Sequence, residues 1–195
     1  MTFDKKLELW DYVVKNQVFV VCKTPMAKSI TKRTLIGYRD AKVNTRYFED
    51  LINQLRQTNK LETFKRKMGQ GKSYWNRKEK TDNMKFNAIV GNPPYQIMDG
   101  GGSGSSSIPI YNYFVQASMF IQPDYVSMIM PSRWFSGGKG LDNFRSMMIN
   151  NKNIRIMHDY MNSTECFSNV SIEGGVCYFL WDRENEGLCN YTSHL

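Results

Sequence analysis

The sequence lacks any long hydrophobic run, and no stretch approaches the roughly 20 apolar residues that span a bilayer. Residues 1–10 are charged and hold no continuous apolar segment, so no signal peptide is visible. We therefore expect a cytoplasmic protein without membrane association. With 195 residues, of which 41% are hydrophobic, the chain is long enough to form a folded domain with its own core.

Cysteine and histidine are scarce, with four and two residues. The cysteines show no Cys-x-x-Cys spacing and have no histidines at metal-ligand spacing; they are Cys22, Cys166, Cys177 and Cys189. We expect no metal site. We interpret the cysteines as free thiols of a reducing compartment, with a disulfide pair as the alternative.

What the chain does contain is a distinctive predicted strand end at residues 86–96. Residues 86–90 form a short apolar run rich in strand formers, and Gly91 ends it. Because Pro93 and Pro94 follow, the chain leaves the strand rigidly extended and without backbone N–H groups at these two positions. Ligands bind at the carboxyl ends of strands in open α/β sheets, so this segment is a candidate site.

The residue types there suit a flat ring that carries an exocyclic amine. The Asn92 side-chain oxygen and the Pro93 carbonyl can each accept one hydrogen from an NH2 group, and Tyr95 can stack on the ring. Two acceptors aimed at an amine draw its lone pair out of conjugation and make the nitrogen more nucleophilic. The alternative is a strand that leaves through a tight Pro-Pro turn, with Tyr95 as an ordinary surface aromatic.

Residues 90–96, Val-Gly-Asn-Pro-Pro-Tyr-Gln, resemble the catalytic motif of adenine-specific DNA methyltransferases of restriction-modification systems. Within that family the match is to the large group in which methylase and restriction activities can share one polypeptide. Further segments that fit the pattern of this group are residues 108–112, 130–135, 137–141 and 172–180. The resemblance covers residues 85–183 well and residues 1–84 loosely, as for the C-terminal part of a methylase domain.

The resemblance implies an α/β fold, namely a partial Rossmann-like class I methyltransferase fold whose mixed sheet carries an antiparallel edge hairpin. Residues 1–84 would form a basic N-terminal segment of the methyltransferase domain, and residues 85–195 its catalytic half. We expect the hairpin from strands at residues 154–160 and 176–181, with Gly174 and Gly175 in the connection.

The charge distribution separates these two parts. Residues 1–84 hold 19 Lys and Arg against 9 Asp and Glu, a net charge of +10, whereas residues 85–195 hold 7 against 9, a net charge of −2. A cationic segment fits a polyanionic partner, because Lys and Arg displace counterions from phosphates. Double-stranded DNA is therefore the expected partner, and simple solvation of Lys-rich helices is the alternative.

The resemblance also implies the roles of individual residues. The catalytic positions are Asn92, Pro93, Pro94 and Tyr95. An aromatic residue in the hairpin connection helps to sandwich a base that is rotated out of the duplex, and Phe167 is our candidate. Arg133 could bind phosphate and Trp134 could line the base pocket, while a purely structural role for both is the alternative.

The implied reaction is direct transfer of a methyl group from S-adenosylmethionine to the amine of a flipped-out adenine in DNA. Enzymes of this family carry an early Phe-x-Gly-x-Gly-type turn and an acidic residue for the cofactor, and the sequence shows neither. Before residue 69 the only isolated glycine is Gly37. We therefore expect an upstream segment or subunit to carry the cofactor motif, and weak or absent methylation by this chain alone.

Two other functions remain open. Glutamine methyltransferases that act on proteins share a similar motif and also present an NH2 group on a planar carbon. A non-catalytic DNA-binding remnant would keep the base pocket without the cofactor half.

The remaining expectations concern single elements. Helices are predicted at residues 7–14, 44–57, 107–121 and 141–148, and further strands at residues 17–22 and 125–130. Residues 28–42 are expected to be a basic loop or edge element. Residues 64–80 are expected to be a basic connection that either tracks a nucleic-acid backbone or packs its aromatics on the domain. Residues 99–107 are expected to form a mobile loop beside the catalytic motif, and residues 137–140 to offer amides to an anion.

Overall fold

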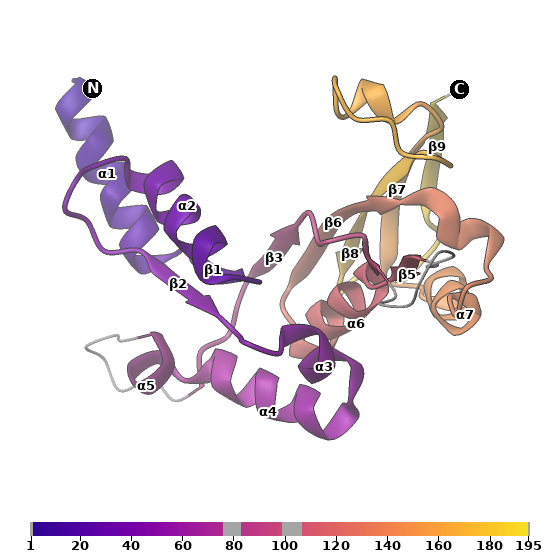
Figure 1. The fold of residues 1–195 in the computed structure, drawn as a ribbon, viewed down its shortest axis with the longest axis horizontal. Coiled ribbons are helices and arrows are strands. Elements are labelled where there is room, and N and C mark those ends of the chain that lie inside the picture. Colours follow the sequence, from indigo (N-terminus) through magenta and orange to yellow (C-terminus); the bar gives the residue numbers. More distant parts are fainter. Residues whose placement is uncertain (1, 76–82, 99–106, 195) are drawn as a thin grey trace. The chain divides into compact units, whose positions relative to one another are not determined.

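The computed structural model describes residues 2–75, 83–98 and 107–194. It divides into two compact units, Met1–Met84 and Lys85–Leu195, which are described separately (Figure 1). Among the described residues, no helix combines the length and the apolar character needed to cross a membrane.

The first unit combines helices with a pair of parallel strands. Its elements are α1 (Phe3–Asn16), β1 (Phe19–Cys22), α2 (Pro25–Ile36), β2 (Asn44–Tyr47), α3 (Leu51–Arg56), α4 (Thr58–Gly69) and α5 (Gly71–Trp75). The strands β1 and β2 run parallel with Phe19 opposite Asn44. The Trp10 indole N–H donates to the Leu35 carbonyl and so joins α1 to α2.

Helix α2 occupies residues 28–36 of a stretch that we expected to be a loop or edge element, so that expectation is wrong for these residues and holds for residues 37–42. The Thr24 hydroxyl accepts from the Ala27 N–H at 3.1 Å, and Pro25 stands in the first turn, where its missing N–H costs nothing. Gly37 ends the helix with φ at +60°. Ile36 is the buried residue of this helix, so the sequence shows no apolar stripe with a helical period.

The predicted single helix over residues 44–57 is also wrong, because its first residues form strand β2. The Asn44 side chain donates to the carbonyls of Val14, Lys15 and Val18, which fixes the start of β2 at the end of α1. The helical periodicity survives only in α3, where Leu51 and Leu55 are buried.

Within the expected connection at residues 64–80, the described part continues as α4 and α5. Trp75 is 2% exposed and donates its indole N–H to the Met68 carbonyl at 2.9 Å. Of the two possibilities stated above, packing of this aromatic residue on its own unit is therefore the one observed. Residues 76–80 lie outside the described residues.

The second unit is built on a five-stranded mixed sheet. Its elements are β3 (Ala88–Gly91), β4 (Gln96–Met98), β5 (Ser107–Pro109), α6 (Tyr111–Ile121), β6 (Tyr125–Pro131), the 3-10 helix η1 (Ser132–Ser136), α7 (Asp142–Asn150), β7 (Ile154–Tyr160), the 3-10 helix η2 (Ser163–Glu165), β8 (Val176–Asp182) and β9 (Asn190–His194). The strand order is β3-β6-β8-β7-β9. The pairs β3–β6 and β7–β9 are parallel, and β8 runs antiparallel to both of its neighbours.

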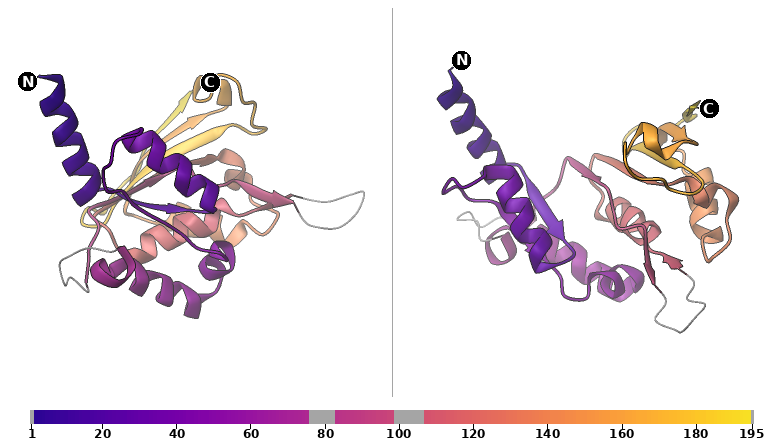
Figure 2. Two further views of the ribbon diagram at one scale, coloured as in Figure 1. Left: turned by 60° about the vertical axis from the view of Figure 1, so that its left-hand side comes forward. Right: turned by 45° about the horizontal axis from the view of Figure 1, so that its top comes forward.

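Strands β4 and β5 lie side by side as a separate antiparallel pair (Figure 2). Residues 107–109 were expected to begin a helix and instead form β5, after which α6 begins at Tyr111. The expected mobile loop falls on residues 99–106, which lie outside the described residues.

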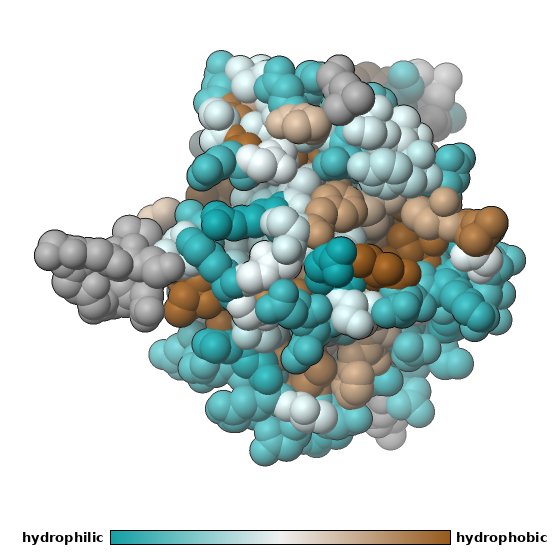
Figure 3. All heavy atoms as spheres, turned by 90° about the vertical axis from the view of Figure 1, so that its right-hand side faces the viewer, coloured by the Kyte–Doolittle hydropathy of each residue, from teal (hydrophilic) through white to brown (hydrophobic). Residues whose placement is uncertain are grey.

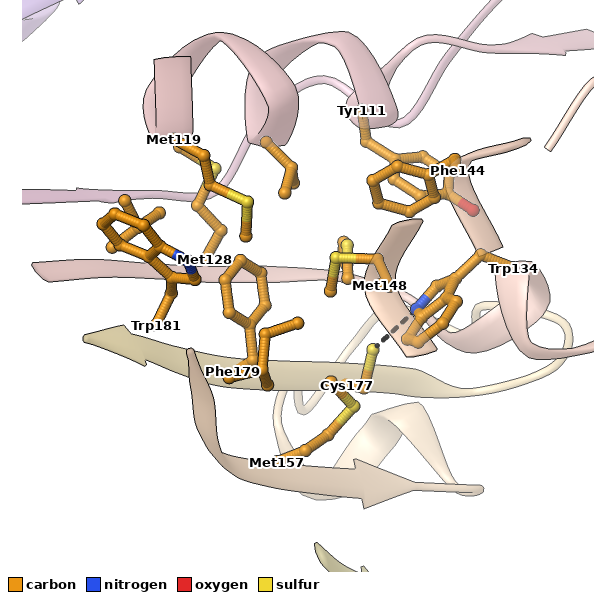
Figure 4. Close-up of a cluster of buried hydrophobic side chains, with 14 of the residues drawn as sticks. Tyr111, Met119, Met128, Trp134, Phe144, Met148, Met157, Cys177, Phe179 and Trp181 are labelled. Carbon is orange, nitrogen blue, oxygen red and sulfur yellow. Dashed lines mark hydrogen bonds between the residues drawn. The ribbon is translucent and has the colours of Figure 1, made fainter. Parts of the chain in front are cut away.

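Helices α6 and α7 cover one face of the sheet and enclose the core. Alternate residues of β6 and β8 point into it, among them Met128 and Phe179, and meet Met119 of α6 and Phe144 of α7 (Figure 4). Apolar residues also reach the surface of the molecule, and one face shows several separate groups of them among hydrophilic residues (Figure 3).

The antiparallel hairpin of β7 and β8 is present, but it does not form the sheet edge. Strand β9 lies beyond it, parallel to β7, with Thr192 opposite His158. This strand was not predicted from the sequence. Its side chains are mostly polar, as is usual for an edge strand that faces water. The four cysteines are free, as expected.

Candidate active site

The Asn-Pro-Pro-Tyr segment begins where β3 ends. Strand β3 pairs with β6 in parallel, and Gly91 at its end lies opposite Met128. Asn92 is exposed, whereas Pro93 is buried behind it. The buried ring fixes the chain direction and the exposed amide stays accessible, so Asn92 is held at the carboxyl end of a parallel strand.

Tyr95 is half-buried, and its backbone is fixed by a hydrogen bond. Its carbonyl accepts from the Ile110 N–H at 3.0 Å, just before α6. Its hydroxyl is buried and has no hydrogen-bond partner among the described residues. Burial, together with the nearby Cys177 and Cys166 thiols, raises the pKa of Tyr95 to about 12. The phenol therefore stays neutral at physiological pH, which favours a stacking role over a proton-transfer role.

The segment after β6 forms the neighbouring part of the site. The Ser132 N–H donates to the Gly175 carbonyl at 3.1 Å, and the Ser132 hydroxyl donates to the Asp159 carboxylate. Arg133 is exposed and so accessible to a ligand. These bonds connect the end of β6 to β7 and to the glycine pair before β8.

Trp134 does not line an opening, and its expected contact with the base is corrected by the structure. It is 2% exposed and belongs to the core, where its indole N–H donates to the Cys177 sulfur at 3.3 Å (Figure 4). Its ring stacks on Phe135, with centroids 4.1 Å apart. Burial of such a large apolar ring in the core stabilises the fold. The contacts of Trp134 therefore support a purely structural role, which was the alternative stated above.

Phe167 lies in the connection between β7 and β8, two residues after the end of η2. It is half-buried, and its N–H donates to the Ser163 carbonyl at 2.9 Å. Part of its ring is therefore accessible, and its contact with a base stays a prediction.

Two features of this region were missed by sequence reasoning. Asp159 is 9% exposed on β7 and accepts from Ser132 and from the Tyr191 hydroxyl of β9, the latter at 3.2 Å. A carboxylate inside an apolar strand was the available signal, because buried charges need partners. The backbone N–H of Gly138 donates to the Asp142 carboxylate in the first turn of α7 at 3.0 Å. This amide is therefore not available to the anion that residues 137–140 were expected to bind.

The described residues do not fit an S-adenosylmethionine site. Such a site needs a glycine-rich turn from strand to helix with free amides. The turn after β1 is Lys23-Thr24-Pro25, without glycine or carboxylate, and the Thr24 hydroxyl takes the Ala27 amide. Nor do the described residues contain a cluster of His, Cys, Asp and Glu that could hold a metal ion.

The mixed sheet, with its motif at the end of a parallel strand, defines an α/β fold of the methyltransferase class. The same fold is found in the type I restriction-modification methyltransferase subunit of Streptococcus thermophilus, with a TM-score of 0.53 at 12% identity over 87% of this chain and 34% of that one. DrdV in complex with DNA gives 0.56 at 14% identity, covering 96% and 23%. The predicted fold class is thereby confirmed.

Within that class, the chain matches the Eco57I restriction-modification methylases over residues 16–167, and it belongs to that family. It is also 37% identical over 106 residues to an uncharacterized adenine-specific methylase of Mycoplasma pneumoniae. That match covers 53% of this chain and 25% of the relative, so the chain spans only a fraction of the proteins it resembles.

Proposed function

We propose that this chain forms the adenine-binding part of a restriction-modification DNA methyltransferase that modifies the N6 amine of adenine. The observation that carries the proposal is the exposed Asn92 amide, held by the buried Pro93 at the carboxyl end of β3. Membership of the Eco57I methylase family supports it.

The chemistry assigned to these residues is recognition and activation of an amine. The Asn92 oxygen and the Pro93 carbonyl accept the two amine hydrogens, and the nitrogen lone pair becomes available for attack. A neutral amine needs no strong base before the methyl group moves. This agrees with the positions of His158 and His194, whose ring nitrogens lie 3.1 Å from each other on β7 and β9.

The target adenine has to leave the duplex before these acceptors can reach its amine. Rotation of a base out of the stack costs a few kcal/mol. Stacking on Tyr95, at about 1–3 kcal/mol per base, together with the two hydrogen bonds, offsets that cost. Phe167 would contact the other face of the base, and the exposed Arg133 a phosphate of the same strand.

The methyl donor is S-adenosylmethionine in this proposal, and a further segment or subunit provides its site. The glycine-free turn after β1 supports this division, as does the length of the relatives. Catalysis would then depend on the alignment of the adenine amine by Asn92 and Pro93.

The test is a methyl-transfer assay on adenine-containing duplex DNA, with the chain alone and fused to the cofactor-binding segment of a family member. We expect N6-methyladenine from the fusion only. In the fusion, Asn92→Ala should lower the rate about 100-fold by analogy with the loss of one preorganised transition-state hydrogen bond. Its DNA affinity should change far less than its rate, because phosphate contacts supply most of the affinity for DNA.

The matched control is Asn185→Ala, which removes an exposed amide from a loop of the same unit. Three outcomes would contradict the proposal: methylation by the chain alone, an unaffected rate in Asn92→Ala, or transfer to a glutamine-bearing protein in preference to DNA.

A non-catalytic DNA-binding remnant is the second candidate, favoured by the misfit of the turn after β1 to the cofactor. The fusion separates the two functions. A remnant would bind DNA, and the fusion would give heat on calorimetric titration with S-adenosylmethionine, yet no methyl group would reach adenine.

A further inference from the structure

The first unit contains an open groove of about 920 Å³ whose walls come from α1, α2, β2 with its preceding loop, and α5. Its charged and aromatic lining residues are Asp11, Tyr12, Lys15, Lys28, Lys32, Asp40, Lys42, Arg46 and Trp75. None of them belongs to the Asn92–Tyr95 segment, so the groove is a different site from the one proposed for adenine.

The groove is strongly cationic. Five of its lining residues are Lys or Arg, and two are carboxylates. One of the carboxylates, Asp11, is bound by the Arg39 guanidinium through two hydrogen bonds of 2.6 and 3.1 Å. That pairing lowers the pKa of Asp11, and Arg39, which does not line the groove, neutralises its charge. The field inside the groove is therefore positive and favours an anion.

The walls of the groove are fixed by hydrogen bonds from Asn44, Arg46 and Trp75. The Asn44 amide joins the start of β2 to three carbonyls at the end of α1. The Arg46 Nε donates to the Tyr74 carbonyl, and its guanidinium lies over the Tyr74 ring at 5.6 Å. Trp75 is held by Met68 and packs edge-on against Phe19. The cations therefore sit on a preorganised surface, which lowers the entropic cost of binding.

We propose that this groove is a phosphate-binding track for the backbone of double-stranded DNA. Its volume exceeds what a single phosphate needs. Its five cations are spread over two helices, a loop and strand β2, and they match a ligand with regularly repeated charges. Arg46 keeps part of its planar fork for phosphate oxygens, because only Nε is used by Tyr74. The choice of DNA as the polyanion rests on the proposed function, whereas the site itself does not.

The experiment measures binding of the intact chain to a short fluorescent DNA duplex by anisotropy, between about 50 and 200 mM salt. The variant is Lys28→Gln with Lys32→Gln, which removes two groove cations from α2. Each phosphate contact contributes about 0.9 to the slope of log K against log salt, so the slope should become shallower by about 1.8. The loss should be the same for duplexes of different sequence, because backbone contacts carry no base information.

The matched control is Lys5→Gln with Lys6→Gln, which removes the same charge from exposed positions of α1 outside the groove. We expect the control to keep the wild-type slope, and both double variants to keep the wild-type melting temperature. An equal change of slope in both double variants would overturn the proposal, because net charge alone would then explain binding. Equal competition by polyglutamate and DNA would also overturn it, in favour of an acidic protein partner.

This result is independent of the adenine site. Asn92→Ala should bind DNA with the wild-type slope. A wild-type fusion that transfers no methyl group to adenine, while the slope still depends on Lys28 and Lys32, would refute the proposed function and leave the groove standing. If the wild-type fusion methylates adenine but the slope is unchanged in the Lys28 and Lys32 double variant, the groove proposal is refuted and the proposed function stands.

Discussion

Asn92 and Tyr95 are only three residues apart, yet the structure presents them in different ways. Asn92 offers its side-chain amide to solvent, whereas Tyr95 offers part of its ring and buries its hydroxyl without a partner among the described residues. An unpaired buried hydroxyl costs free energy and contributes nothing to stacking. At this position the ring is therefore the functional group and the hydroxyl is dispensable.

The first prediction follows from that difference. Tyr95→Phe should keep DNA methylation by the cofactor-bearing fusion and raise the free energy of unfolding by about 1 kcal/mol, since a buried unsatisfied group is removed. Tyr95→Ala should lose about 1–3 kcal/mol of base stacking. Urea unfolding and the methyl-transfer assay measure the two effects, and a large loss of activity in Tyr95→Phe would refute a role confined to stacking.

The pH dependence of the same residue has a defined sign. Burial raises the pKa of Tyr95 from 10.0 to about 12 in the folded chain, so the unfolded chain loses this proton first. Below pH 10 both states keep the proton, and ionisation of Tyr95 does not reduce the free energy of unfolding. As the pH rises from 10 towards about 12, ionisation favours the unfolded chain and the free energy of unfolding of the wild type falls. The advantage of Tyr95→Phe over wild type in urea unfolding should therefore grow between these two values. A constant difference over that range would contradict it.

Gly174 and Gly175 provide a second residue-scale prediction with a built-in control. Both have positive φ, at +84° and +76°. A Cβ at Gly174 would meet nothing within 4 Å, whereas one at Gly175 would collide with the Tyr160 carbonyl and touch Met161. Gly174→Ala should cost about 1–2 kcal/mol for its backbone conformation, and Gly175→Ala about 1–3 kcal/mol more from the collision. Equal losses in thermal or urea unfolding would exclude the collision.

At the scale of elements, the strands with long apolar runs were predictable and those stabilised by distant contacts were not. The runs at residues 125–130 and 176–181 identify β6 and β8 directly, because both are central strands of the sheet and are rich in apolar residues. Strand β2 was read as helix since its start depends on Asn44 bonding to the end of α1, 26–30 residues away. No local pattern records such a contact.

Helix α2 was missed for a different reason. It carries Thr24 and Pro25 at its start and Gly37 at its end, which are ordinary helix signals. Its lysines concealed the helical period. The site was more predictable than the fold around it: the Asn-Pro-Pro-Tyr segment was identified from its residue types, but the burial of Trp134 depends on the packing of α7 and β8.

Strand β9 gives the element-scale prediction. The His194 ring stacks on Tyr160 of β7 with centroids 4.0 Å apart and planes at 3°. His194→Ala should lower the free energy of unfolding by about 0.5–1.5 kcal/mol, the range for an aromatic pair. His194→Phe keeps a ring in place and should restore most of the loss in urea unfolding. Failure of phenylalanine to rescue would assign the effect to the contact between His194 and His158 instead.

At the scale of the whole molecule, the second unit exposes an apolar strand. Strand β3 has β6 as its one neighbour among the described residues, and Val90 is 75% exposed. An uncovered apolar edge favours pairing with another chain. Val90→Lys should therefore reduce concentration-dependent association in sedimentation velocity without changing the core.

The control for this prediction is Leu188→Lys, which adds the same charge at a position that is 92% exposed in the loop before β9. It should leave association unchanged. If both substitutions reduce association equally, the added charge and not the strand edge is responsible.

The open edge of β3 also affects Asn92, the residue that follows this strand. Among the described residues β3 is paired on one side only, so the direction of the Asn92 side chain depends on β6 and on the buried Pro93. A further extended segment laid along β3 would restrain it from both sides and narrow the angles that the amide samples. Binding of a partner along β3 and recognition of the base would then be coupled, and the partner that completes the sheet would also affect how well the site binds adenine.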